Sequence, residues 1–191
     1  MRTAKISRKT KETDISAILS LDGGECEIST GIGFFDHMLT AFAVHGGFGL
    51  KLKVKGDLEV DGHHTVEDTG IVLGQAFSKA LGDKSGIARY GSFYVPMDEA
   101  LALCVVDVSG RPYLVFDDVF DGQMIGGLDS SLIVEFLRAF AFNAGITLHI
   151  NVMYGKNAHH MAEAVFKSLG HALKAACAIT GSDVLSTKGV L

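Results

Sequence analysis

The chain has 191 residues, of which 48% are hydrophobic and 20% charged, with only 2 prolines, so wholesale disorder is excluded. Its formal net charge of -5 argues against a protein that coats nucleic acid. No apolar stretch reaches the roughly 20 residues that span a bilayer, so no membrane partner is expected. The three cysteines are far apart and form no CxxC pair, which argues against a disulfide framework or a thiolate metal site. A soluble cytoplasmic protein is expected.

Apolar patterning predicts both strands and helices. The predicted elements, in chain order, are a strand at 15–21, a helix at 34–44, a strand at 50–54, a helix at 65–81, strands at 101–108 and 113–116, a helix at 128–142, a strand at 146–152 and a helix at 159–178. Helices separated by several strands favour an α+β fold over a doubly wound parallel sheet.

An internal repeat is the most informative feature of the sequence. His63-His64-x-x-Glu67 opens one predicted helix, and His159-His160-x-x-Glu163 opens another 96 residues later. Further matched pairs flank these motifs: Phe42 and Phe140, Gly47 and Gly145, Leu50 and Leu148, Val54 and Val152, Gly74 and Gly170. The repeat predicts an internally duplicated half-domain, with residues 1–90 and 91–191 forming one compact pseudo-symmetric unit.

Paired imidazoles followed by a carboxylate on one helix suit a metal ion. His63 and Glu67 lie about 40° apart around the helix and roughly 6 Å along it, so they can bind the same ion. His64 points about 100° away from His63 and is better placed for a second ion. The alternative is that the paired histidines only cap or decorate the start of a helix. Two copies of the motif favour the metal hypothesis.

Two octahedral ions need more than six ligands, so each half is expected to supply one more. His37 in the first half aligns with Glu135 in the second. Eight ligands are then predicted: His37, His63, His64, Glu67, Glu135, His159, His160 and Glu163. Imidazoles and carboxylates without thiolates suit Mn²⁺, Fe²⁺ or Zn²⁺, and an octahedral shell favours Mn²⁺. The protease pattern HExxH is absent.

Six segments occur in an order that resembles the imidazoleglycerol-phosphate dehydratases of histidine biosynthesis: FFDHML, DGHHTVEDTGI, RYGSFYVPMDEAL, DVSGRPYL, GKNAHHMAEAVFK and STKGVL. The resemblance runs from Thr10 to Leu191. It implies helices packed between two β-sheets, two Mn²⁺ per active site, and active sites between the subunits of a twenty-four-subunit homo-oligomer. It further implies a hydro-lyase that removes water from imidazole glycerol phosphate to give imidazole acetol phosphate. Many relatives carry histidine where this chain has Glu135.

The resemblance also implies the remaining roles. Catalysis falls to Glu12, His63, Glu67, His159 and Glu163. The substrate, with its phosphate, would be bound by Glu12, Arg89, Arg111, Lys167, Ser186 and Lys188. Asp98 and Glu99 are candidates for orienting the ligand histidines, or for structural hydrogen bonds. From the residues alone, Glu12 and each basic residue are better explained as solvated surface charges, and only the resemblance assigns them these roles.

Two other functions fit a duplicated metal motif. A metal-storage oligomer needs the ligands without Glu12, Arg89 or Lys188. A metallohydrolase acting on a phosphorylated metabolite would use bound Mn²⁺ to activate water.

Overall fold

The computed structural model describes residues 1–189 and 191. In the first half of the chain six elements follow one another: β1 (Thr3–Lys9), β2 (Thr13–Ser20), β3 (Cys26–Ser29), α1 (Gly33–Gly46), β4 (Gly49–Gly56) and α2 (His63–Leu81). The second half repeats this order and inserts two short strands before its first helix: β5 (Tyr90–Met97), β6 (Ala100–Asp107), β7 (Tyr113–Phe116), β8 (Met124–Ile125), β9 (Leu128–Asp129), α3 (Leu132–Ala144), β10 (Thr147–Tyr154) and α4 (Ala158–Ala176).

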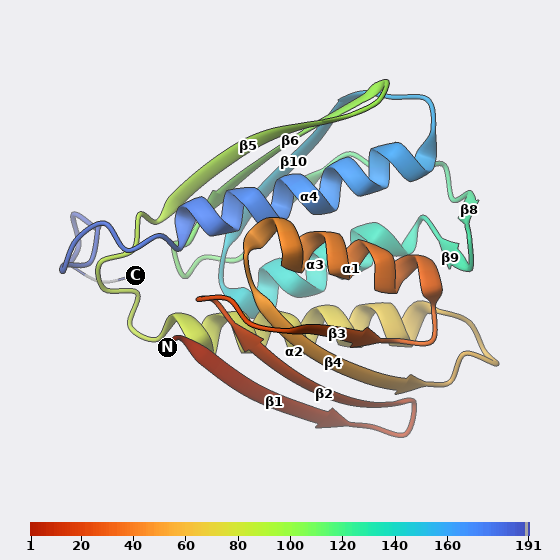
Figure 1. Ribbon diagram of the computed structural model, residues 1–191, viewed down its shortest axis with the longest axis horizontal. Helices are drawn as coiled ribbons and strands as arrows, with labels where there is room; N and C mark the ends of the chain where they lie inside the picture. The colour runs from red at the N-terminus through yellow and green to blue at the C-terminus, as the bar shows by residue number, and fades with distance from the viewer. Residues whose placement is uncertain (190) are drawn as a thin grey trace.

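The two large sheets have the same topology. Their strand orders are β1-β2-β4-β3 and β5-β6-β10-β7. In each sheet one pair of strands is parallel, β3 with β4 and β7 with β10, and the other pairs are antiparallel. The four helices lie between the sheets (Figure 1). The predicted α+β fold with a duplicated half-domain is therefore confirmed, whereas the boundary at residue 90 between the two halves of one pseudo-symmetric unit stays a prediction.

Close helix packing explains the glycines that the repeat shares. A Cβ at Gly74 of α2 would lie 2.6 Å from the carbonyl oxygen of Phe140 in α3. A Cβ at Gly170 of α4 would lie 2.5 Å from the carbonyl oxygen of Phe42 in α1. Both distances are below van der Waals contact, so only glycine allows these helix pairs to approach as closely as they do. Around them, phenylalanines from all four helices form the centre of the core.

The helices begin at the same end of the molecule, at the right of Figure 1, and the C-terminal segment lies at the opposite end. Two turns reach the first end as well, the turn between β1 and β2 and the turn between β5 and β6. This arrangement gathers the HHxxE motifs and both turns around one end of the helical layer.

The differences from the predicted elements lie mainly at sheet edges. Strands β1, β3 and β5 are edge strands that the apolar pattern does not predict, because most of their side chains are polar or exposed. Helix α3 begins at Leu132 instead of residue 128, since β9 occupies that position. Among the residues described, no helix is both long and apolar enough to cross a membrane.

Candidate active site

Two histidines and a glutamate converge where α4 begins beside α1. His159 Nε2 lies 3.2 Å from Glu163 Oε2, and His37 Nε2 of α1 lies 3.5 Å from the same oxygen. The three ligand atoms are all within 4.8 Å of one another, and in residues 1–189 and 191 no other three such side chains converge this closely. Two imidazoles and a carboxylate are the donors that Mn²⁺, Fe²⁺ and Zn²⁺ accept. This cluster therefore fits one divalent metal ion.

Local contacts hold the two histidine rings of this cluster. Asn157 caps α4, because its side chain accepts a hydrogen bond of 2.9 Å from the backbone N–H of His159. The ring of Phe34 meets the ring of His159 edge-on, with 5.0 Å between centroids, and lies 6.3 Å from that of His37. Asn157 and Phe34 thus limit the movement of the two ligand histidines.

Glu163 is buried, being 7% exposed, and is paired with Lys167 one turn further along α4. The Nζ of Lys167 lies 2.8 Å from Glu163 Oε1. Burial acts to raise the pKa of Glu163, but the hydrogen bond and charge of Lys167, together with His37, lower the pKa below its usual value. Lys167 thus keeps the Glu163 carboxylate ionised.

The second histidine of this motif points to a different element. His160 Nδ1 lies 2.7 Å from Glu99 Oε2, and its Nε2 lies 3.5 Å from Asp98 Oδ2, both in the turn between β5 and β6. The Glu99 hydrogen bond raises the pKa of His160, and the same bond is the main reason that the pKa of Glu99 falls to about 2. The two carboxylates therefore orient His160 away from the ion that His159 would bind.

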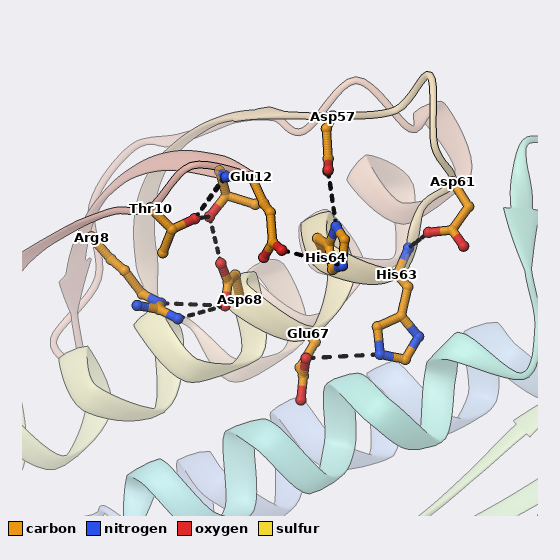
Figure 2. A network of polar contacts seen from close by, with 10 residues as sticks. Arg8, Thr10, Glu12, Asp57, Asp61, His63, His64, Glu67 and Asp68 are labelled. Carbon is orange, nitrogen blue, oxygen red and sulfur yellow. Dashed lines mark hydrogen bonds and ion pairs between the residues drawn. The ribbon is translucent and has the colours of Figure 1, made fainter.

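The first half repeats this division (Figure 2). His63 Nε2 faces Glu67 Oε2 at 3.8 Å on α2. His64 turns the other way, with its Nδ1 3.0 Å from Asp57 Oδ2 and its Nε2 3.8 Å from Glu12 Oε1. The Asp57 hydrogen bond raises the pKa of His64. Glu12 lies in the turn between β1 and β2, and its side chain is 53% exposed.

Glu135, the eighth predicted ligand, has a different partner. It lies in the first turn of α3 and forms an ion pair with Arg138. In the described part of the chain it does not complete a compact three-ligand group with His63 and Glu67. Its role as a ligand stays a prediction.

Four of the predicted phosphate ligands line one hollow. Arg89, Arg111, Ser186 and Lys188 surround it, together with Tyr90 and the segment before Ser186. Asp107 joins the two arginines: Arg89 Nε lies 2.7 Å from its Oδ1, and an Arg111 nitrogen lies 3.4 Å from its Oδ2. Arg89 also donates a 2.7 Å hydrogen bond to the carbonyl oxygen of Leu185, which fixes the C-terminal segment against the hollow.

The hollow and the cluster of His37, His159 and Glu163 lie at opposite ends of α4. The backbone N–H of Arg89 donates to the carbonyl oxygen of Ala176, the last residue of that helix. His159 is the second residue of the helix. At a rise of 1.5 Å per residue, the two ends are separated by about 25 Å. Lys167 is therefore the one predicted phosphate ligand that does not lie at the hollow.

Comparison with known proteins identifies the family. Residues 30–173, more than half of the chain, match the family described as imidazoleglycerol-phosphate dehydratase. This chain belongs to the imidazoleglycerol-phosphate dehydratase family. It is 60% identical over 191 residues to the imidazoleglycerol-phosphate dehydratase of Clostridium botulinum (strain Langeland), covering 98% of this chain and 97% of that protein. The Methylorubrum populi dehydratase is 57% identical and is covered completely.

Solved dehydratases share the fold as well. The crystal structure of imidazoleglycerol-phosphate dehydratase from Staphylococcus aureus matches with a TM-score of 0.85 at 41% identity, over 93% of this chain and 99% of that one. The structure from Pyrococcus furiosus matches with a TM-score of 0.85 at 40% identity, over 97% and 100%. The duplicated fold is therefore that of the dehydratase family.

Two acidic residues of this dehydratase-family site are absent from the sequence prediction. Asp57 holds His64, and Asp68 holds the turn that carries Glu12. The stretch of acidic residues between β4 and the HHxxE motif, of which Asp57 is the first, was a usable signal. Asp68 gives no such signal, because its partners lie more than fifty residues earlier in the chain.

Proposed function

We propose that this chain removes water from imidazole glycerol phosphate to give imidazole acetol phosphate, with two Mn²⁺ ions per active site. The observation that carries the proposal is the convergence of His37, His159 and Glu163 from two helices, in a chain of the dehydratase family. The three residues are far apart in sequence, and an imidazole-rich, thiolate-free donor set suits Mn²⁺.

The remaining ligands proposed are His63, His64, Glu67, Glu135 and His160. Bound Mn²⁺ supplies a Lewis acid that favours the ionised form of an imidazole ring. Asp57 and Glu99 each accept a hydrogen bond from Nδ1 of a motif histidine, His64 or His160, which directs the Nε2 lone pair outward. The protein's own contribution is thus to fix which nitrogen of each ring is free to bind.

Glu12 is proposed to move a proton. Dehydration removes the hydroxyl group, as water, from the carbon beside the imidazole ring and a proton from the next carbon. The resulting enol then takes up a proton at the carbon beside the ring and becomes the ketone. The Glu12 carboxylate lies 3.8 Å from His64 Nε2 and is open to solvent. It is therefore next to a proposed metal ligand and accessible to a substrate held there.

The phosphate is proposed to bind in the hollow at the other end of the molecule. Arg89 and Arg111 offer guanidinium groups, and Ser186 and Lys188 add a hydroxyl and an ammonium group. Asp107 holds both guanidinium groups in place, so they need little reorganisation when an anion binds.

The separation of these two regions supports an active site formed between subunits. A small phosphorylated metabolite cannot span about 25 Å along α4. We therefore propose that the metal end of one copy meets the hollow of another in a homo-oligomer, for which twenty-four subunits is the number the family resemblance implies. Exposed apolar side chains on the outer sheet faces, including Val105 and Val115, are available for contacts between copies.

The test is direct. The purified protein loaded with Mn²⁺ is incubated with imidazole glycerol phosphate, and the products are identified. Imidazole acetol phosphate supports the proposal, whereas release of free phosphate indicates a hydrolase and no turnover indicates metal storage. His64→Ala and His160→Ala should each abolish turnover and lower bound manganese. Lys79→Ala, a change at an exposed lysine in the last turn of α2, is the control and should retain both.

A further inference from the structure

The two halves of the molecule differ at the residue that follows each ligand glutamate of the HHxxE motifs. Asp68 follows Glu67 in α2, and Ala164 follows Glu163 in α4. Asp68 is buried, being 5% exposed, and so is Ala164. Burying a carboxylate is unfavourable unless charged or hydrogen-bonded partners compensate it. The first half therefore retains a costly group where the second half has an alanine.

Asp68 connects helix α2 to both strands of the hairpin formed by β1 and β2. Arg8 of β1 lies with its Nε 3.2 Å and a terminal nitrogen 3.0 Å from Asp68 Oδ1. The hydroxyl of Thr13 in β2 donates a 2.5 Å hydrogen bond to Asp68 Oδ2. Each carboxylate oxygen thus holds one strand, as Figure 2 shows for Arg8.

The same network continues to the backbone of Glu12. The hydroxyl of Thr10 accepts hydrogen bonds from the N–H of Glu12 at 3.0 Å and from the N–H of Thr13 at 2.9 Å. The hydroxyls of Thr10 and Thr13 lie 3.3 Å apart. Two hydroxyl groups therefore link the Asp68 carboxylate to the residue that carries the proposed acid–base group.

The position of Asp68 on α2 explains the position of Glu12. Asp68 lies one helical turn after His64, so both point from the same face of the helix. Because the hydrogen bonds to Asp68 hold the hairpin against α2, Glu12 Oε1 lies 3.8 Å from His64 Nε2. In the second half the corresponding turn contains only Asp98 and Glu99 between the paired residues of β5 and β6, and Glu99 bonds His160 directly.

We propose that Asp68 is a positioning residue: through Arg8, Thr13 and Thr10 it holds the β1–β2 turn so that Glu12 faces the metal-binding surface of α2. The inference rests on the proposed role of Glu12 in proton transfer. It explains why the residue after the motif glutamate is a buried aspartate in the half that carries Glu12 and an alanine in the other half. Asp68 itself touches neither substrate nor metal.

The test compares variants of the assembled, Mn²⁺-loaded protein. Thr13→Val removes the hydroxyl that Asp68 accepts from and retains the shape, whereas Thr13→Ser restores the hydroxyl. Misplacing a reacting group by about 1 Å can reduce the rate roughly a hundredfold, so kcat should fall about tenfold to a hundredfold in Thr13→Val and in Asp68→Asn. KM and manganese content should stay near wild type, and Thr13→Ser should recover most of kcat. Asp14→Asn, which breaks an exposed ion pair with Lys9 on the same hairpin, is the control.

A double-mutant cycle separates positioning from general destabilisation. If Asp68 acts through Glu12, Asp68→Asn should lower kcat in the wild type and have no further effect in the Glu12→Gln background. Faster amide hydrogen exchange at Glu12 and Thr13 in Thr13→Val should accompany the loss. Equal losses in both backgrounds, or an unchanged kcat in Thr13→Val and Asp68→Asn, would overturn the inference. If Glu12→Gln itself keeps full activity, the proposed role of Glu12 is the part that fails.

Discussion

The two histidines of each HHxxE motif have different partners. The first histidine faces the glutamate of its own helix, and the second faces an acid from another element. Helix geometry alone predicts this divergence. Among the partners, Asp98 and Glu99 were candidates in the sequence, and both contact His160. The contact of Glu12 with His64 could not be predicted in this way, because it depends on how the β1–β2 turn packs against α2.

Loss of Arg89 should mainly weaken substrate binding. A hydrogen bond to a charged group contributes roughly 1.5–3 kcal/mol, so Arg89→Ala should raise KM about tenfold to a hundredfold. Titration calorimetry with inorganic phosphate should show the same loss, while Lys79→Ala, at an exposed lysine in the last turn of α2, should bind normally. Undiminished phosphate binding by Arg89→Ala would show that the hollow is not the phosphate site.

The pair formed by His45 and His171 should make stability depend on pH. Their ring nitrogens lie 3.0 Å apart. Burial is the main cause that lowers both pKa values below 6.5, with Lys174 contributing at His171 and with His171 and Lys167 contributing at His45 against the opposing charge of Glu163. The folded state then binds fewer protons than the unfolded state, so stability falls as the pH decreases through 6.5.

Replacing one of these histidines should weaken that dependence. Between neutral and mildly acidic pH, the melting temperature of His45→Gln should fall less than that of the wild type. The variant lacks one of the groups that take up a proton on unfolding. Parallel curves for the two proteins would argue against a contribution from this pair.

Secondary-structure elements were predicted best where they are buried on one face. The four helices and the central strands show regular apolar spacing, whereas β1 and β5 lie at sheet edges and expose most of their side chains. The repeat was more informative about helix packing than the apolar periodicity was. Its paired glycines at 74 and 170 mark the close contacts of α2 with α3 and of α4 with α1. The inserted strands β8 and β9 have no counterpart in the first half, so the repeat could not predict them.

Adding a methyl group at these helix contacts should destabilise the fold. Gly74→Ala and Gly170→Ala each place a Cβ against a backbone carbonyl oxygen of the neighbouring helix. That oxygen can move away only if the neighbouring helix moves with it. Overpacking of this kind costs about 1–3 kcal/mol, so the melting temperature should fall by several degrees. Gly33→Ala in α1 is the control, because nothing lies within 4 Å of its added Cβ. Equal melting temperatures for all three variants would contradict the close-packing explanation.

At the scale of the whole molecule, the cluster of His37, His159 and Glu163 and the hollow beside Arg89 are a helix length apart. Neither region alone contains both the proposed metal ligands and the proposed phosphate ligands. In the sequence, only the resemblance to the family predicted a homo-oligomer. The separation of Arg89 from His159, which is the structural argument for it, depends on how the elements pack. The fold supplies the physical reason for proposing a shared site.

Metal removal should affect assembly. The two histidines of each HHxxE motif face different ways, so we propose that one copy offers ligands to ions that it shares with another copy. Ions held in this way would stabilise the assembled state, because separated subunits would retain only part of each ligand set. Chelation at neutral pH should therefore convert the large particle into smaller folded oligomers, and Mn²⁺ should restore it. Sedimentation velocity distinguishes the outcomes: if the metal-free protein keeps its full assembled mass, the ions do not hold the copies together.

Complementation between two defective variants tests the shared dehydratase site most directly. Arg89→Ala retains all the proposed metal ligands and lacks one proposed phosphate ligand of the hollow. His160→Ala retains the hollow and lacks one proposed metal ligand. Co-expressed subunits with different tags are purified as mixed assemblies, and formation of imidazole acetol phosphate is measured at low substrate concentration. The account predicts a rate well above that of either parent variant, because some sites then combine an intact metal end with an intact hollow. A rate no higher than the parents in verified mixed assemblies would contradict a site shared between copies.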